Sequence, residues 1–589
     1  MKKIALLFII TLNAVFLFAQ NREDENMLPN YSTLQEALTP YHQRNDFEEE
    51  NLLPLPKNLR AMAEWEELQG LSIAWVGQNL ILSEIVRAAR LECNVSILCK
   101  DSTVLKSCKA YLISKNIDVS SNVSFLIKPT DSIWMRDYGP NPVYENDVDS
   151  LALVDWIYNR NRPSDDSCTS AISKFYNIPL YRTLKKPDDL VHTGGNFMSD
   201  GLGNGFSSEL IFDENGIKQN VPTTIKTEGQ IDSIMQKYMG ITRYTKMKIL
   251  PYDGIHHIDM HMKLLDEETL IFSQYANNVA DGAQIEANLQ YILQNFKTPY
   301  GKPYKIVRVL SPPDASGKFP DKNGQYRTYS NMTFVNKTVL VPYYEQKYDT
   351  TAEHILKAAL PGYKIVGINC NSIIGQLGAI HCITKELGVP DPLWITHEKK
   401  TDIPTYAGEK IPVSARIQHR SGIKEANVWY KLSTDDVFKP LPLQNTTANN
   451  WAANFENLPN NSVIQYYVEA TAKNAKKIRR PITAPEGFYT FKLGATITAT
   501  DDNAVLNSVK VYPNPARAIT CVEIKNAANI EANVTLFDVM GRNIKTLQNG
   551  ILQDEINRFF FDAADYQSGI YFVKIKTKNG EQVEKVVVE

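Results

Sequence analysis

The sequence lacks several features that mark common classes of protein. Its seven cysteines include no CxxC pair, so zinc binding by paired cysteines is not indicated. The 63 basic residues are balanced by 66 acidic ones, and nothing suggests the basic face of a nucleic-acid-binding protein. After the first twenty residues no stretch approaches eighteen apolar residues, so we expect no transmembrane segment in the mature protein.

The N-terminal residues predict export. MKKIALLFIITLNAVFLFAQ has two lysines, an uncharged apolar run and a small residue at Ala19, which is typical of a signal peptide over residues 1–19. An uncleaved anchor is the alternative, but the run is short and the polar NREDEN follows at once. Residues 20–58 are polar and acidic, and we interpret them as a pro-segment or N-terminal arm. Seven cysteines in an exported protein leave at least one unpaired.

The length of 589 residues predicts about three or four domains. In residues 59–398, short β-branched runs such as NVSILC alternate with helical patterns such as SEIVRAARL, which predicts an α/β domain. Residues 399–495 alternate in period two between turn signals, which is typical of an immunoglobulin-like β-sandwich, here expected to be a spacer. A polar linker at 496–504 leads to a small all-β unit at 505–589.

This last unit resembles the type A sorting domain of the Bacteroidetes type IX secretion system. Three segments carry the resemblance: VYPNPA at 511–516, LFDVMGR at 536–542 and SGIYFVKI at 568–575. The resemblance implies that the type IX secretion machinery is a partner and that the tail is an address without activity. It also implies a place outside a Gram-negative cell or on its outer-membrane surface.

Cys382 is the cysteine with the strongest indication of chemistry. The pattern ITKELG that follows it predicts a short helix ended by glycine, which would put the sulfur near a helix N-terminus and lower its pKa. From spacing alone, a structural cysteine beside a tight turn fits equally well. Cys370, in the apolar strand pattern YKIVGIN, is expected to be a small buried residue.

Two other segments carry candidate functional residues. In DGIHHIDMHMKLL, the alternation of His257, Asp259 and His261 predicts a strand with all three on one face. Such a set suits either a zinc site or an acid/base beside a substrate-binding carboxylate. In SIWMRDYGP, Asp137 near Trp134 is suited to holding a cation, although a turn-capping aspartate beside a core tryptophan is the simpler alternative.

Together, WMRDYGP, HTGGNF at 192–197, HIDM at 257–260 and GAIHC at 378–382 resemble the Porphyromonas-type peptidylarginine deiminases and the related agmatine deiminases. The resemblance covers about residues 60–395 and implies a five-bladed α/β propeller with the site at its axis. It implies that Cys382 is the nucleophile, His257 the acid/base, and Asp137 and Asp259 the clasp of a guanidinium. It also implies that Asn331 lines the substrate site, where Trp134 is expected as an aromatic ring beside Asp137.

Arg160 and Arg162, in DWIYNRNRPSDD, match the arginines that hold the C-terminal carboxylate of peptide substrates in the secreted relatives. Thr193 departs from the glutamate that agmatine deiminases carry before the Gly-Gly pair. The predicted function is therefore conversion of peptidyl-arginine, preferably C-terminal, to peptidyl-citrulline and ammonia through a covalent cysteine intermediate, with no metal or cofactor. Three alternatives stay open: an agmatine or free-arginine deiminase, a metallohydrolase using His257, Asp259 and His261, and a silent adhesin.

Overall fold

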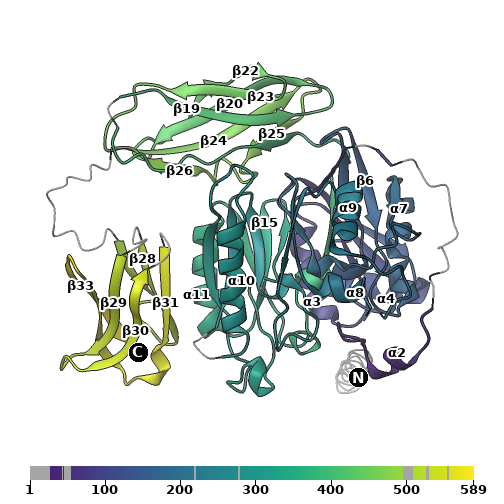
Figure 1. The fold of residues 1–589 in the computed structure, drawn as a ribbon, viewed down its shortest axis with the longest axis horizontal. Coiled ribbons are helices and arrows are strands. Elements are labelled where there is room, and N and C mark those ends of the chain that lie inside the picture. The colour runs from purple at the N-terminus through teal and green to yellow at the C-terminus, as the bar shows by residue number, and fades with distance from the viewer. Residues whose placement is uncertain are drawn as a thin grey trace, which may run out of the picture.

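The computed structural model describes residues 27–42, 44, 55–56, 58–217, 220–275, 279–406, 408–494, 508–525, 530–552 and 556–589. The expected signal peptide and the linker at 496–504 lie outside the described residues. An α/β part, coloured purple to teal, is followed by a green β-sandwich and a yellow all-β part (Figure 1). Among the described residues, no helix is long and apolar enough to cross a membrane.

Five separate sheets build the α/β part, and each contains an antiparallel strand pair followed by a parallel pair. The strands, grouped by sheet, are β17 (Lys385–Gly388), β2 (Leu68–Ala74), β3 (Asn94–Cys99) and β4 (Val123–Ile127); β1 (Leu59–Ala61), β5 (Asn141–Glu145), β6 (Ser150–Asp155) and β7 (Leu180–Arg182); β8 (Met198–Ser199), β9 (Asn204–Ser208) and β10 (Arg243–Met247); β11 (Met262–Asp266), β12 (Thr269–Gln274) and β13 (Lys305–Leu310); and β14 (Thr333–Val335), β15 (Thr338–Tyr343) and β16 (Lys364–Asn369).

Each parallel pair is connected through a helix, so the unit strand–strand–helix–strand occurs five times. The crossover helices of these five units are α3 (Asn79–Ala89), α7 (Cys168–Tyr176), α9 (Glu228–Met239), α10 (Gly282–Asn295) and α11 (Gln346–Ala359), and α4 (Ser102–Ser114) connects β3 to the additional parallel strand β4. Strand β17, at the end of this part, pairs with β2 from its beginning, with Lys385 opposite Ser72. The two ends of the α/β part are thereby joined in one sheet.

One helical pattern and four strand patterns of the α/β part are confirmed. SEIVRAARL lies on α3, whose buried stripe includes Ile81, Leu82, Ile85 and Val86, as expected for an amphipathic helix against a sheet. The apolar runs NVSILC, KIVRVL, TVLVPYY and YKIVGIN supply β3, β13, β15 and β16. The near-continuous burial of β3 and β15 suits strands that pair in parallel with helices packed against them, whereas β13 and β16 are more exposed.

The green part in Figure 1 consists of two antiparallel sheets around a shared apolar core. Along β19 the side chains of Ile411, Val413 and Ala415 are buried and alternate with exposed ones, which explains the period-two pattern. The strands are β18 (Trp394–Thr396), β19 (Ile411–Gln418), β20 (Ile423–Leu432), β21 (Lys439–Pro442), β22 (Gln444–Thr447), β23 (Asn450–Phe455), β24 (Val463–Ala472), β25 (Lys477–Arg480) and β26 (Tyr489–Lys492). Because β18 pairs with β19, this sheet begins before the boundary expected at residue 398.

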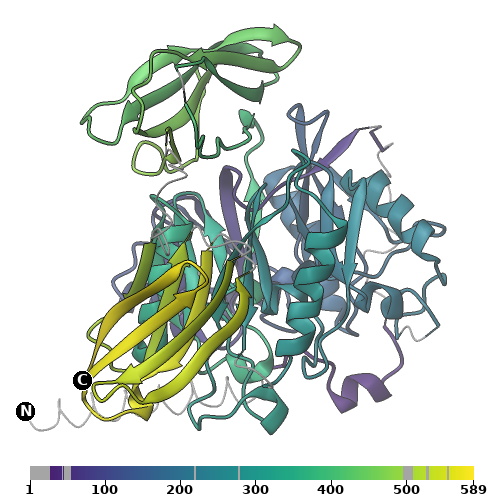
Figure 2. The ribbon, with the colours of Figure 1, turned by 60° about the vertical axis from the view of Figure 1, so that its left-hand side comes forward.

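The C-terminal part also has two antiparallel sheets and packs against helix α11 of the α/β part (Figures 1 and 2). Its strands are β27 (Ser508–Tyr512), β28 (Ile519–Lys525), β29 (Ile530–Asp538), β30 (Asn543–Leu552), β31 (Ile556–Asp562), β32 (Gly569–Thr577) and β33 (Gly580–Val588). The rings of Tyr512 and His354 have centroids 4.1 Å apart, and the Thr351 hydroxyl donates to the Ile519 carbonyl at 2.8 Å.

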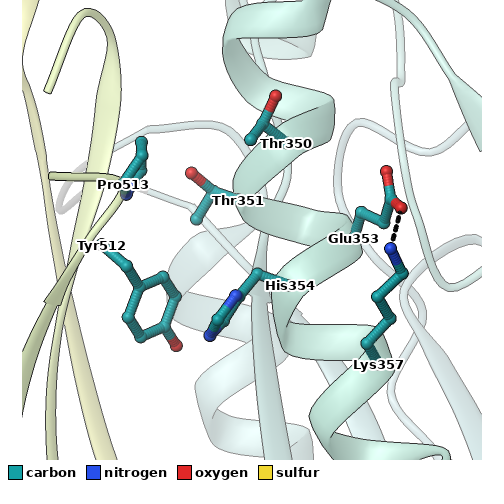
Figure 3. A pocket seen from close by; sticks show the side chains of 7 residues that line it. All are labelled: Thr350, Thr351, Glu353, His354, Lys357, Tyr512 and Pro513. Carbon is teal, nitrogen blue, oxygen red and sulfur yellow. Dashed lines mark ion pairs between the residues drawn. The ribbon is translucent and has the colours of Figure 1, made fainter. Parts of the chain in front are cut away.

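A cavity of about 240 Å³ lies between α11 and the start of the C-terminal part, as Figure 3 shows. Its lining residues are Thr350, Thr351, Glu353, His354, Lys357, Tyr512 and Pro513. None of them is a site residue expected from the sequence. The cavity therefore belongs to the junction of two parts of the chain and does not contribute to the chemistry described below.

Candidate active site

Apart from Arg160 and Arg162, the expected site residues lie on short segments that stand immediately before the first strand of an antiparallel pair in the five sheets. Asp137 lies on α5 (Met135–Tyr138) before β5, and Asp259 lies on the 3-10 helix η2 (Ile258–Met260) before β11. The remaining segments are η1 (Gly194–Asn196) before β8, Asn331 before β14 and η5 (His381–Ile383) before β17. Segment α5 contacts both η1 and η5, and η1 contacts η2. The repeated strand–strand–helix–strand unit thus brings together residues that are far apart in the sequence.

Cys382 is fully buried among polar partners. The Asn331 amide donates to its Sγ at 3.2 Å, and a carboxylate oxygen of Asp259 lies 3.6 Å from the same atom. The helix expected after Cys382 is wrong, because ITKELG forms strand β17 after a single 3-10 turn. Burial and the charge of Asp259 raise the pKa of the Cys382 thiol well above its ordinary value. In the ligand-free site Cys382 is therefore a thiol.

The two carboxylates each use one oxygen for the protein and leave the other free. The Gly195 N–H donates to Asp137 Oδ1 at 3.2 Å, and His381 Nδ1 donates to Asp259 Oδ2 at 2.7 Å. Asp137 Oδ2 and Asp259 Oδ1 are buried and have no hydrogen-bond partner among the described residues. Buried acceptors without partners are costly, so this pair of oxygens is suited to a ligand with several N–H donors.

The pKa values of the two carboxylates are shifted in opposite directions. Burial, with the nearby charge of Asp259, raises the pKa of Asp137 to about 7. Burial also raises the pKa of Asp259, but the hydrogen bond from His381 and the charges of His381 and Arg136 together hold the pKa below its ordinary value. Two neighbouring carboxylates cannot both be charged at low cost unless a cation joins them.

His257 lies beside Asp137, on the backbone just before η2. Its Nε2 is 3.2 Å from the Thr193 hydroxyl, and its Nδ1 is 3.6 Å from Asp137 Oδ1. Burial lowers the pKa of His257 to about 3, so the imidazole is neutral at pH 7. A Cβ atom on Gly195 would stand 2.5 Å from His257 Nδ1, so the second glycine of HTGGNF permits this close approach.

The strand expected for His257, Asp259 and His261 is wrong. The backbone turns through η2, and the strand begins only at Met262, so the three side chains do not line one face. Among the described residues, the ligand atoms that cluster within 4.8 Å belong to Glu64, His381 and Glu386. His257, Asp259 and His261 do not converge as a metal site would require, which removes the structural basis of the metallohydrolase alternative.

A buried charge network that the sequence did not indicate supports Asp259. His381 Nε2 lies 3.1 Å from both carboxylate oxygens of Glu64, while its Nδ1 faces Asp259. Lys263 forms an ion pair with Glu64. Because the two ring nitrogens of His381 face Glu64 and Asp259, the ring links the two carboxylates and fixes the orientation of Asp259. Glu64 is 317 residues from His381, and no local pattern could have linked them.

The three remaining expected residues lie together near the N-terminal arm. The Trp134 indole donates to the Leu28 carbonyl at 2.9 Å. Arg160 donates to the Asn30 carbonyl, and Arg162, whose side chain is 1% exposed, pairs with Glu36 at 2.5 Å. Arg162 is therefore not on a solvated face. The charge of Arg160 acts on both Asp137 and His257, which connects this group to the carboxylates.

Comparison with known proteins identifies the family. Residues 60–388, more than half of the chain, match the Porphyromonas-type peptidyl-arginine deiminases. The chain belongs to this family. Its members and the related agmatine deiminases act on guanidino groups, so this deiminase-family chain is an enzyme of that kind.

Individual relatives of this deiminase-family chain are distant. A protein named as an agmatine deiminase in Mycoplasma mycoides is 24% identical over 313 residues, which are 48% of this chain and 82% of the relative. One from Vibrio parahaemolyticus is 24% identical over 315 residues, covering 48% and 84%. A solved structure named as an agmatine deiminase covers 59% of this chain and all of its own, at 19% identity and TM-score 0.51. This likeness shows a common α/β fold.

The C-terminal part also has known relatives. Residues 510–589 match the secretion system C-terminal sorting domain. This match confirms the identification made from VYPNPA, LFDVMGR and SGIYFVKI. The sorting domain directs the deiminase-family chain to the cell surface or the exterior, and it implies contact with the type IX secretion machinery.

Proposed function

We propose that this protein is a secreted peptidyl-arginine deiminase that uses Cys382 as nucleophile and prefers arginine at the C-terminus of a peptide. The observation that carries the proposal is the pair of free oxygens, Asp137 Oδ2 and Asp259 Oδ1, buried beside a thiol and a neutral histidine. A guanidinium is planar, permanently charged and rich in N–H donors, so it is complementary to this pair. No metal or cofactor is required for the reaction.

Binding of the guanidinium prepares the nucleophile. Its positive charge offsets the two carboxylates whose presence raises the pKa of the Cys382 thiol. The thiol can then pass its proton to neutral His257, leaving a thiolate next to the guanidinium carbon. The Asn331 amide, which already donates to Sγ, stabilises that thiolate.

The proposed reaction passes through one covalent intermediate on Cys382. Cys382 Sγ bonds to the guanidinium carbon, and His257 gives its proton to one terminal nitrogen, which leaves as ammonia while the C–N bond breaks. The remaining thiouronium is cationic and stays between Asp137 and Asp259. His257 takes a proton from water as the water attacks the same carbon, and the C–S bond breaks to release the ureido product. In sum, a guanidinium and water give a ureido group and ammonium.

The repeated topology supports a five-bladed propeller as the arrangement of the five sheets. Every sheet contributes a site segment at the same position, immediately before the first strand of its antiparallel pair. The pairing of β17 with β2 joins the last unit to the first, as closure of such a propeller requires. A site at the axis would follow from this symmetry.

Arg160 and Arg162 support the preference for a C-terminal arginine. Their guanidinium groups bind acceptor groups of the arm, and a free carboxylate offers the same chemistry with a full charge. An agmatine deiminase is the second candidate, because similar curated proteins carry that name. Agmatine has no carboxylate for the two arginines, and Thr193 bonds to His257 where agmatine deiminases carry glutamate.

A substrate panel tests the proposal. Citrulline or the corresponding ureido product is measured with a peptide ending in arginine, its C-terminal amide, a peptide with internal arginine, free arginine and agmatine. We expect the free C-terminal arginine to give the highest kcat/KM, and Cys382→Ala to abolish turnover while Cys370→Ala, at another buried cysteine, retains it. Highest activity on agmatine would favour an agmatine deiminase. Full activity in folded Cys382→Ala would refute the assignment of Cys382 as the nucleophile.

A further inference from the structure

The N-terminal arm, residues 27–42 and 44, contacts segments that lie next to the site residues. The Leu28 carbonyl accepts the Trp134 indole N–H, and Trp134 immediately precedes the helix that carries Asp137. Asn30 is fully buried: its backbone N–H donates to the Gln376 carbonyl at 3.0 Å and its side chain to the Leu377 carbonyl at 3.1 Å. The arm thus connects the segment before Asp137 with the segment before Cys382.

The arm also occupies the two arginines expected to bind substrate. The Asn30 carbonyl accepts from Arg160 Nε at 3.2 Å and Nη2 at 3.0 Å. The Glu36 carboxylate accepts from Arg162 Nε at 2.5 Å and Nη2 at 3.2 Å. The carbonyls of Pro29 and Tyr31 take further donations from Arg162. A carboxylate with two oxygens on one guanidinium is what the C-terminus of a peptide would present there.

The orientation of Glu36 is fixed by its own helix. In α2 (Leu34–Leu38), Glu36 and Thr33 form a capping box, in which the Glu36 side chain accepts from the Thr33 N–H at 2.7 Å. Partial burial raises the pKa of Glu36, but the hydrogen bonds from Arg162 and Thr33 and the charge of Arg162 together lower the pKa below its ordinary value. Glu36 is therefore charged at neutral pH, where the ion pair is fully formed.

Contacts after α2 hold the rest of the arm. The Asn161 amide donates to the carbonyls of Thr39 and Pro40 at 3.3 and 2.9 Å. Arg44, whose side chain is 1% exposed, forms an ion pair with Asp155 at 2.9 Å. The arm is therefore anchored on both sides of Glu36, which keeps its carboxylate at a high effective concentration next to Arg162.

From these contacts we infer that the arm closes the entrance to the site as an internal competitor of the substrate, with the Glu36 carboxylate in the place of the substrate's C-terminal carboxylate. The inference rests on the proposed function, because that function assigns Arg160 and Arg162 to the substrate. While the arm is docked, the site binds substrate weakly, since the apparent affinity falls with the fraction of open molecules. Displacement or removal of the arm gives the high-affinity form of the enzyme.

The test uses the folded full-length chain with a specific protease site inserted between residues 45 and 54. Cutting after purification avoids any effect of the arm on folding. With a peptide ending in arginine, we expect KM to fall at least about tenfold after the cut and removal of the arm, with kcat little changed. A synthetic peptide of residues 27–44 should restore the high KM by competition.

Point variants test the same contact without cutting. Glu36→Lys places a positive charge against Arg162 and should lower KM as the cut does. Gln35→Lys is the matched control, because Gln35 lies on the same helix and is exposed. Equal KM values in cut and uncut enzyme, or equal KM values in the two lysine variants, would overturn the inference.

A second measurement does not depend on activity. Alkylation of Cys382 by iodoacetamide, followed by peptide mass, should become faster after the cut and in Glu36→Lys, but not in Gln35→Lys. Buried Cys370 serves as the internal reference, whose rate should not change. If no guanidino compound is converted by any form, the proposed function fails, while the alkylation rates still decide on the arm. An unchanged Cys382 rate after arm removal would refute the closed entrance.

Discussion

The floor and the entrance of the candidate site differ in how their polar groups are satisfied. At the floor, Asp137 Oδ2, Asp259 Oδ1 and His257 Nδ1 are buried without a hydrogen-bond partner among the described residues. At the entrance, Arg160 and Arg162 are bonded to carbonyl and carboxylate oxygens of the N-terminal arm. The floor is thus complementary to a cation with N–H donors, and the entrance is already occupied by an anion.

Under the proposed function, this difference predicts where the substrate carries its charges. A molecule that satisfies both regions has a guanidinium at one end and a carboxylate at the other, which describes arginine with a free carboxyl group. Agmatine carries an ammonium group and no carboxylate at its other end, and a peptide with internal arginine has no free carboxylate on that residue. On this account the floor provides the chemistry, whereas the entrance provides the preference among substrates.

The largest effect should come from removing charge at the floor. Asp137→Asn and Asp259→Asn should each reduce kcat/KM about 10²–10³-fold, because a charge-assisted bond to the guanidinium is lost in a desolvated site. Asp149→Asn, at an exposed carboxylate, is the control and should keep wild-type activity. Near-full activity in either floor variant, measured as ureido product, would mean that the two carboxylates do not hold the substrate.

The double substitution Arg160→Ala/Arg162→Ala should act on one class of substrate. Measured in enzyme freed of its arm, it should weaken kcat/KM for free C-terminal arginine by about 3 kcal/mol or more, at ~1.5–3 kcal/mol for each charged hydrogen bond. Peptides with internal arginine should react much as with the wild type. A uniform loss on both substrates would assign the arginines a structural role instead.

The acidity of Asp137 predicts that kcat/KM changes about tenfold per pH unit on the acid side of its pKa. Burial raises the pKa of this carboxyl to about 7, and its charged form is the one that binds guanidinium, so kcat/KM should be lost as pH falls through about 7. Bound guanidinium favours the charged form, so the acid limb of kcat should lie at lower pH. Coincident limbs of kcat and kcat/KM, in a pH titration of both, would contradict this assignment.

Removing the sorting domain should have the smallest effect on catalysis. Deletion of residues 505–589 exposes the face of α11 that contacts Tyr512 and Ile519, so thermal stability should fall somewhat while kcat/KM of the purified enzyme stays unchanged. The same deletion should prevent release from the native cell. Detection of the shortened protein in the medium would refute the role of the tail in export.

Local patterns predicted the helices, most strands and the sorting domain, because amphipathic spacing and motifs are properties of neighbouring residues. They failed where distant parts of the chain decide the structure. ITKELG has helix-forming residues, yet it is a strand, because Leu387 and its neighbours pair with β2 more than 300 residues away. For His257 to His261, the turn of η2 replaces the expected strand and buries Asp259 against His381.

The candidate site residues were predicted because they stand in motifs that resemble a known family. The residues that support them, Glu64 and the arm residues Asn30 and Glu36, have no motif of their own and reach the site only in the folded chain. The fivefold repeat was expected only through the family resemblance, since it is a repeat of topology. No segment of the sequence displays it as similar letters.

The most direct measurement is the mass of the peptide that contains Cys382, after acid quench of the enzyme during turnover of a peptide ending in arginine. We expect an adduct on Cys382 whose mass equals that of the substrate less ammonia. This adduct should disappear as ureido product forms. The adduct should be absent when Cys382 has been alkylated beforehand and should not occur on Cys370. Turnover with unmodified Cys382 throughout, or with Cys382 fully alkylated, would contradict the role of Cys382 as the nucleophile.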